Sequence, residues 1–142
     1  MTISENGLNL IKNAEGLRLT SYKCQAGVWT IGFGSTKDVV EGMTITAEEA
    51  DKRLREDVRW AEKVVNLNCM GLNQHQFDAL VSFVFNVGSG NFRSSTLLKK
   101  VTKDPNDPTI RDEFMKWIKA GGEVSEGLRA RRKRESDLYF FK

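Results

Sequence analysis

Glu15 is the residue whose position most directly suggests chemistry. It lies at the end of a helix predicted over residues 3–15, immediately before Gly16. A carboxylate in the last turn of a helix faces the partial negative charge of the helix C-terminus, which disfavours its charged form. If the side chain is also half-buried, the protonated form is favoured further, and a general acid needs this form near neutral pH. An exposed glutamate without a chemical role is the alternative.

A cluster of basic residues near the C-terminus is the second candidate. Five of the six positions from 129 to 134 are basic, namely Arg129, Arg131, Arg132, Lys133 and Arg134. This density can bind phosphate or another polyanion, although a solvated helix face has the same pattern. The whole chain has 22 basic and 19 acidic residues and a formal charge of +3, which favours anionic partners only mildly.

Length and composition exclude several classes of protein. The 142 residues, 39% of them hydrophobic, fit one compact domain with its own core. Two cysteines, Cys24 and Cys69, and the single His75 are too few for a disulfide scaffold or a Cys/His zinc site, so we expect no metal and no cofactor. We find no apolar run long enough to cross a membrane and no signal peptide, so we expect a cytoplasmic protein without membrane insertion.

Hydrophobic periodicity predicts an α+β fold, in which a helix, a small antiparallel sheet and a long helix precede an all-helical remainder. The sheet is expected from extended segments at residues 17–19 and 28–31, which glycines separate. Thr46 and Glu49 have the spacing of a capping box and begin an amphipathic helix that is expected to end near Asn66. A sheet lobe beside a helical lobe would leave a cleft where an extended polymer can bind.

The remaining helices are predicted from residues that cap helix N-termini. In chain order these are Asn73 with Gln76, Ser94 or Ser95, Asp107 with Pro108, and Ser125. They predict a buried helix ending near residue 86, a short helix to residue 101, a helix over residues 109–120, and a basic helix to about residue 139.

The spacing around Glu15 carries a family resemblance. Eight residues separate Glu15 from Cys24, five separate Cys24 from Thr30, and glycines follow at positions 32 and 34. This pattern closely resembles the active-site signature of the phage-type lysozymes, the muramidases that phages use as endolysins. Residues 77–88, 92–98 and 127–132 also resemble segments of that family, in the same order, so that the resemblance covers essentially the whole chain.

The resemblance implies one two-lobed lysozyme domain over residues 1–142. A sheet lobe would span about residues 16–45, and a connecting helix would span about residues 47–66. The helical lobe would span about residues 67–142, with the first helix packed on it. The implied activity is hydrolysis of the β-1,4 bond between N-acetylmuramic acid and N-acetylglucosamine in peptidoglycan, which would lyse the host cell.

The same resemblance assigns the catalytic residues. Glu15 would donate a proton to the glycosidic oxygen, and the Thr30 hydroxyl would position a water molecule or another nucleophile. Cys24 stands where general glycosidase chemistry expects a second carboxylate, and a thiol is mostly neutral at pH 7 unless its pKa is lowered. Cys24 therefore activates water, attacks the sugar, or has no part in the reaction. Cyclisation of the sugar's own hydroxyl would instead make the enzyme a lytic transglycosylase.

Substrate contacts and partners also follow from the resemblance. Phe85, Asn86 and Ser95 match positions that line the cleft, although Phe85 is equally well explained as core. Arg129 or Arg132 could hold Glu15 in orientation. Peptidoglycan glycan strands are the expected substrate, a phage holin would open the membrane so that a monomeric enzyme reaches the cell wall, and no nucleic-acid partner is expected. A polyanion-binding module and a peptidoglycan-binding protein without activity are the rival classes.

Overall fold

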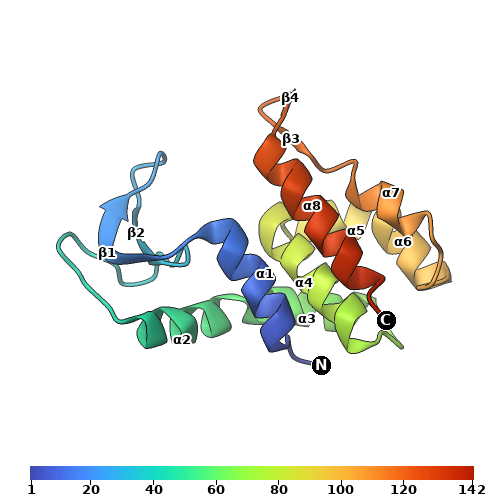
Figure 1. Ribbon diagram of the computed structural model, residues 1–142, viewed down its shortest axis with the longest axis horizontal. Coiled ribbons are helices and arrows are strands. Elements are labelled where there is room, and N and C mark those ends of the chain that lie inside the picture. The colour runs from blue at the N-terminus through green and yellow to red at the C-terminus, as the bar shows by residue number, and fades with distance from the viewer. The chain divides into compact units, whose positions relative to one another are not determined.

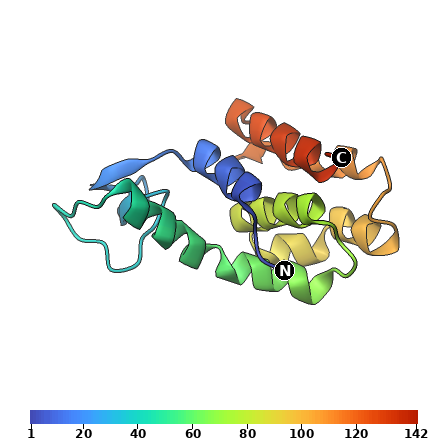
Figure 2. The same cartoon turned by 60° about the horizontal axis from the view of Figure 1, so that its bottom comes forward.

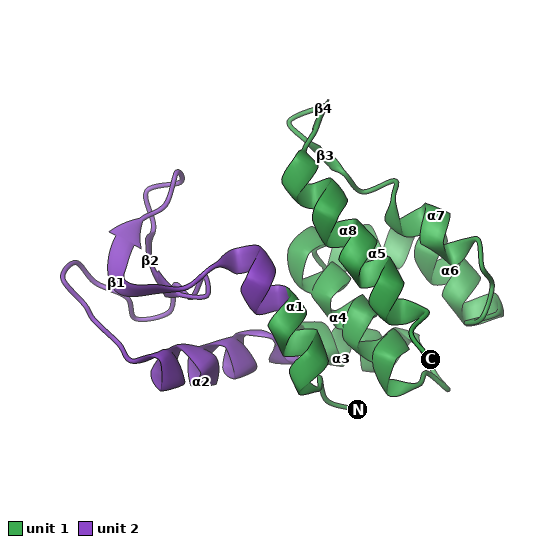
Figure 3. Ribbon diagram, in the orientation of Figure 1, with its two compact units in different colours: residues 1–10, 60–142 green, residues 11–59 purple.

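The computed structural model describes residues 1–142 and confirms the α+β class, with mostly helical structure and two small antiparallel sheets (Figure 1). The chain divides into two compact units, which Figure 3 colours separately. Unit 1 comprises residues 1–10 and 60–142, and unit 2 comprises residues 11–59. The first helix, α1 (Glu5–Glu15), belongs partly to each unit. None of the helices combines the length and the apolar character needed to cross a membrane.

Unit 2 is built around a hairpin and one helix. Strands β1 (Arg18–Lys23) and β2 (Trp29–Gly32) are antiparallel, with Tyr22 opposite Thr30. Helix α2 (Ala47–Asp57) contacts β2. Thr46 caps this helix, as predicted, because its Oγ1 accepts the N–H of Glu49 at 3.1 Å. Buried side chains on these two elements are Ile31 on β2 and Ala50 and Leu54 on α2.

Unit 1 is a helical bundle with a small hairpin. Its elements are α3 (Arg59–Asn68), α4 (Gln74–Val87), α5 (Ser89–Ser94), α6 (Thr96–Lys103), α7 (Ile110–Phe114), β3 (Lys119–Ala120), β4 (Glu123–Val124) and α8 (Glu126–Tyr139). Helix α4 packs against α8 (Figure 2). The ring of Phe83 on α4 is fully buried and meets the rings of Phe114 and Trp117 edge to face, at 5.5 Å and 5.8 Å between centroids. The nearly all-round apolar sequence of α4 thus forms the core of unit 1, as predicted.

The helix predicted from Thr46 to Asn66 differs in the structure. It is two helices, because α2 ends at Asp57 and α3 begins at Arg59. Val58 between them keeps αR backbone angles, and its N–H still bonds to Leu54 O at 3.0 Å. The predicted apolar positions 50, 54, 58, 61 and 65 are all buried. The periodicity therefore located the buried face, and the irregularity at Val58 left that face unchanged.

The helix predicted over residues 109–120 is wrong for most of its length. Only α7 is helical there, and a short hairpin of β3 and β4 follows it, so the remainder of the chain is not all-helical. Gly121 and Gly122 have φ values of 59° and 85° and form the turn of this hairpin. Two adjacent glycines with left-handed backbone favour a hairpin turn over a helix end. Helix α5 was also not expected.

Candidate active site

Glu15 is the last residue of α1, and Gly16 with φ 75° ends the helix, as the sequence predicts. Its carboxylate lies beside the backbone that follows β2, because Oε2 is 3.5 Å from the position that a Cβ atom would take at Gly34. Glu15 is exposed rather than half-buried, so the burial considered from the sequence is not found. The carboxylate thus lies in unit 2 between the end of α1 and the loop at Gly34.

Cys24 directly follows β1 and begins the turn that leads into β2. Its N–H donates to Val28 O at 3.0 Å, and the N–H of Gly27 donates to Cys24 O at 2.8 Å. Hydrogen bonds from the backbone N–H groups of Val28 and Ala26 hold the pKa of the Cys24 thiol below its ordinary value. The turn therefore favours the thiolate, which is the nucleophilic form of cysteine.

Thr30 lies on β2 and is buried, with 4% of its surface exposed. Its hydroxyl donates to Val28 O at 3.0 Å and also hydrogen-bonds to the Cys24 thiol, which lowers the pKa of that thiol further. The structure thus brings two of the three predicted catalytic side chains into contact. They share unit 2 with Glu15.

An ion pair that the sequence did not reveal holds the end of α1. Lys12, one turn before Glu15, pairs with Asp51 on α2, and Arg55 Nε donates to the same carboxylate at 2.7 Å. The hydrogen bonds from Lys12 and Arg55 hold the pKa of Asp51 below its ordinary value. Lys12 Nζ also lies 5.5 Å from the centroid of the ring of Phe33, the residue that precedes Gly34. These contacts tie α1 to α2 and to the loop beside Glu15.

In unit 1, two of the predicted substrate residues line one pocket. Asn86 and Arg132 border it together with Asn91, Lys116, Trp117, Lys119 and Leu128. Phe85 is half-buried, and its ring lies 6.1 Å from that of Trp60. Arg129 is exposed, with Nη1 3.7 Å from Glu126. Lys119 and Trp117 were not singled out from the sequence, because the hairpin that follows α7 was not expected.

Two predicted contact residues have structural partners. Ser95 is 4% exposed and caps α6, where its Oγ accepts the N–H of Leu98 at 3.0 Å and donates to Phe92 O at 2.6 Å. Arg132 is fully buried and pairs with Glu135 and Asn86, while its Nε donates to Trp117 O at 2.9 Å. The partners that the structure gives to Arg132 thus lie within unit 1.

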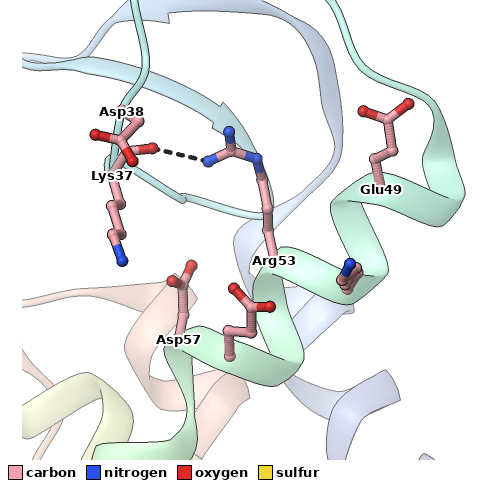
Figure 4. Close-up of a pocket in the computed structure, with 7 residues that line it drawn as sticks. Lys37, Asp38, Glu49, Arg53 and Asp57 are labelled. Atoms are coloured by element: carbon pink, nitrogen blue, oxygen red, sulfur yellow. Dashed lines mark hydrogen bonds between the residues drawn. The ribbon is translucent and has the colours of Figure 1, made fainter.

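A separate charged pocket lies in unit 2, between α2 and the loop after β2 (Figure 4). Its lining side chains are Lys37, Asp38, Glu49, Lys52, Arg53, Glu56 and Asp57. Arg53 Nη1 donates to Lys37 O at 2.9 Å across it. Because the charges of both signs are intermixed and none of the predicted site residues lines this pocket, it is not the candidate site.

Comparison with known proteins identifies the family. The Phage lysozyme family matches residues 12–135. The endolysin of Acyrthosiphon pisum secondary endosymbiont phage 1 is 44% identical over 144 residues, which cover 98% of each chain. The endolysin of Bacillus phage B103 is 44% identical over 98% of this chain, which spans 54% of that protein. The structure of the muramidase domain of SpmX from Asticaccaulis excentricus matches with a TM-score of 0.90 and 37% identity over 99% of each chain. The chain therefore belongs to the phage lysozyme family and is a muramidase of the endolysin type.

Proposed function

We propose that the protein hydrolyses the β-1,4 bond between N-acetylmuramic acid and N-acetylglucosamine in bacterial peptidoglycan and thereby lyses the host cell. Its family supports this activity. The observation that carries the proposal is that the residues of the signature share one compact unit, in which the Thr30 hydroxyl contacts the Cys24 thiol. A thiolate and a hydroxyl that lie beside each other can both act on the same face of a reacting sugar.

Glu15 is the proposed general acid. It donates its proton to the glycosidic oxygen. As the bond from this oxygen to the N-acetylmuramic acid ring breaks, that ring develops oxocarbenium character. Gly34 beside the carboxylate is exposed and carries no side chain, so a sugar ring can approach Glu15 from that side. The ion pair between Lys12 and Asp51 keeps the end of α1 in place during this approach.

Cys24 and Thr30 are proposed to act on the opposite face of the sugar. The thiolate that the turn favours supplies negative charge, which stabilises the positive charge of the oxocarbenium ion. The Thr30 hydroxyl orients the attacking water through a hydrogen bond. As the water oxygen bonds to the sugar, the Cys24 thiolate accepts the proton that the water loses. A cysteine with a lowered pKa can in this way replace the second carboxylate of the usual glycosidase pair.

The remaining contacts and partners belong to the same proposal. Phe85 and Asn86 contact the glycan strand, and exposed Arg129 favours binding to the anionic cell wall. The enzyme acts as a monomer. It accumulates in the host cytoplasm and reaches the wall when a holin opens the membrane.

Mass spectrometry of the fragments released from purified peptidoglycan tests the activity. We expect wild-type protein to release fragments with a reducing N-acetylmuramic acid end, and Cys24→Ser to release the same ends more slowly. Anhydro-sugar ends would show a lytic transglycosylase, and the absence of fragments would show a binding protein, so either result would contradict the proposal. Expression with and without a holin, followed by culture turbidity, tests the route to the wall.

A further inference from the structure

Glu135 on α8 is a buried carboxylate to which no part of the site described above assigns a role. It is fully buried and pairs with Arg132 through Oε1. Its Oε2 accepts the Ser82 hydroxyl at 2.6 Å and Arg131 Nε at 3.3 Å. Well-packed apolar residues often stabilise a core as much as a buried ion pair does, because removing two charges from water is costly. Stability alone therefore does not explain this network.

The network continues from Glu135 to the pocket of unit 1 through Arg132. The guanidinium of Arg132 donates to Glu135 through Nη1, to Trp117 O through Nε and to Asn86 Oδ1 through Nη2. Three partners on different segments of the chain fix the plane of this rigid group.

The contact with Arg132 determines the orientation of the Asn86 amide. A guanidinium has donors only, so the amide oxygen must face Arg132 and the NH₂ group must face elsewhere. Asn86 is exposed and lines the pocket together with Trp117. The amide can thus present its hydrogen-bond donors to a ligand in the pocket.

We propose that Glu135 is a positioning residue for substrate binding, which acts through Arg132 to hold the Asn86 amide so that its Nδ2 donates to an acceptor oxygen of the glycan strand. This inference rests on the proposed function, since it assumes that glycan occupies the pocket. Without the carboxylate, Arg132 has no counterion in a buried position and its guanidinium is no longer held between Glu135 and Asn86.

Binding of a tetrasaccharide of alternating N-acetylglucosamine and N-acetylmuramic acid, measured by calorimetry, tests the proposal. We expect Glu135→Gln to raise the Kd about tenfold, the effect of losing one well-placed hydrogen bond between the Asn86 amide and the glycan. Asp78→Asn is the matched control, because Asp78 is also fully buried but bonds instead to Ser4 and Gln74. We expect it to lower stability without changing the Kd. An equal rise of the Kd in both variants would overturn the inference.

A double-mutant cycle separates positioning from a general structural effect. In the Asn86→Ala background, we expect Glu135→Gln to cause no further rise of the Kd, since the group that it positions is already absent. A full tenfold rise in that background would overturn the inference. Should Glu135→Gln fail to fold, Arg132→Lys serves instead, because it keeps a charge beside Glu135 and loses the fork that reaches Asn86. It is expected to raise the Kd similarly, and an unchanged Kd would overturn the inference.

A spectroscopic measurement distinguishes failure of this inference from failure of the proposed function. Wild-type protein that bound no tetrasaccharide would contradict the proposed function. The orientation of Asn86 is then read from its side-chain amide signals in NMR spectra, assigned by their loss in Asn86→Ala. We expect these signals to shift in Glu135→Gln and to stay in place in Asp78→Asn. Signals that stay in place in both variants would overturn the inference.

Discussion

The hydroxyl of Thr30 hydrogen-bonds to the thiol of Cys24 across the turn that joins β1 to β2, and it also reaches Val28 O at 3.0 Å. A threonine hydroxyl has one hydrogen, so it can donate to only one of these partners at a time. When the thiol is protonated, the Thr30 hydroxyl donates its hydrogen to Val28 O. When the thiol loses its proton, the hydroxyl can turn to the thiolate and stabilise it.

This relationship predicts the pH dependence of alkylation. The backbone N–H of Val28, that of Ala26 and the Thr30 hydroxyl lower the pKa of the Cys24 thiol. We therefore expect the rate of its alkylation by iodoacetamide to reach half its maximum at a lower pH than in the urea-unfolded protein. Thr30→Val removes one donor to the thiolate, and the profile should move to higher pH. The measurement is the alkylation rate of Cys24 against pH, by mass spectrometry of peptides.

Two internal comparisons control that experiment. Thr20→Val makes the same change at an exposed position of β1 and should leave the profile in place. Cys69 is buried, which raises its pKa to about 11, so it should react little below that pH. A Cys24 profile that Thr30→Val does not move would contradict the assigned hydrogen bond.

A side chain at Gly34 should affect both the stability of the protein and the surroundings of Glu15. Its φ of 90° is strained for any residue with a side chain, and a Cβ would meet Glu15 Oε2 at 3.5 Å. We expect Gly34→Ala to cost about 1–2 kcal/mol of unfolding free energy, because of the positive φ. We expect it to lower turnover of peptidoglycan as well, because the added methyl group would lie in van der Waals contact with the carboxylate, on the side from which the sugar is proposed to approach. Urea unfolding and turnover are measured on the same samples.

Gly42→Ala is the matched control for this substitution. Gly42 has a φ of 79° in the same unit, and a Cβ there would meet nothing within 4 Å. It should lose similar stability with little change in turnover. Equal losses of turnover in both variants would show that the position of Gly34 beside Glu15 has no special importance.

The parts of the fold that could be predicted depend on contacts local in the sequence. Asn73 and Ser125 are predictable as helix caps, and Ser95 as one of two alternatives with Ser94, because each capping side chain accepts an N–H only three residues ahead. The apolar face of α4 was likewise visible from its periodicity. The hairpin of β3 and β4 was missed because its strands have only two residues each, too few to show an alternating pattern.

The sequence predicts which residues form the candidate site, but it does not predict how they are arranged. The spacing of Glu15, Cys24 and Thr30 follows from the resemblance to the family, and the contact between Cys24 and Thr30 follows from their places on a hairpin. The exposure of Glu15 and the pairing of Lys12 with Asp51 did not follow, since they depend on how distant segments pack. The partners of Arg132 could not be predicted for the same reason.

The ion pairs of Glu113 should make the free energy of unfolding depend on pH. It is 4% exposed, and Lys100 and Lys116 donate to its carboxylate at 2.8 Å and 2.9 Å. The hydrogen bonds from Lys100 and Lys116 hold the pKa of Glu113 below its ordinary value. A carboxyl group with a lowered pKa in the folded state stabilises that state above its unfolded pKa of about 4.3 and loses the effect as the pH falls through the folded value.

We therefore expect Glu113→Gln to lower the unfolding free energy by about 1–2 kcal/mol at pH 7 and by much less at pH 3. Urea unfolding at pH 7, 5 and 3 provides the measurement. Glu126→Gln is the comparison, because its partner Arg129 lies 3.7 Å away at the surface and such pairs contribute about 0–1 kcal/mol. Losses of the same size at pH 7 and pH 3 would refute the role given to the two lysines.

Glu15→Gln tests whether Glu15 delivers the proton to the glycosidic oxygen, and the measurement is the rate at which this variant releases reducing ends from purified peptidoglycan. Because positioned general acids contribute at least about 100-fold, we expect the rate to fall by that factor or more while the urea midpoint stays at the wild-type value. Glu41→Gln, at an exposed position of the same unit, should keep the wild-type rate. A folded Glu15→Gln protein that released reducing ends at nearly the wild-type rate would show that Glu15 is not the general acid.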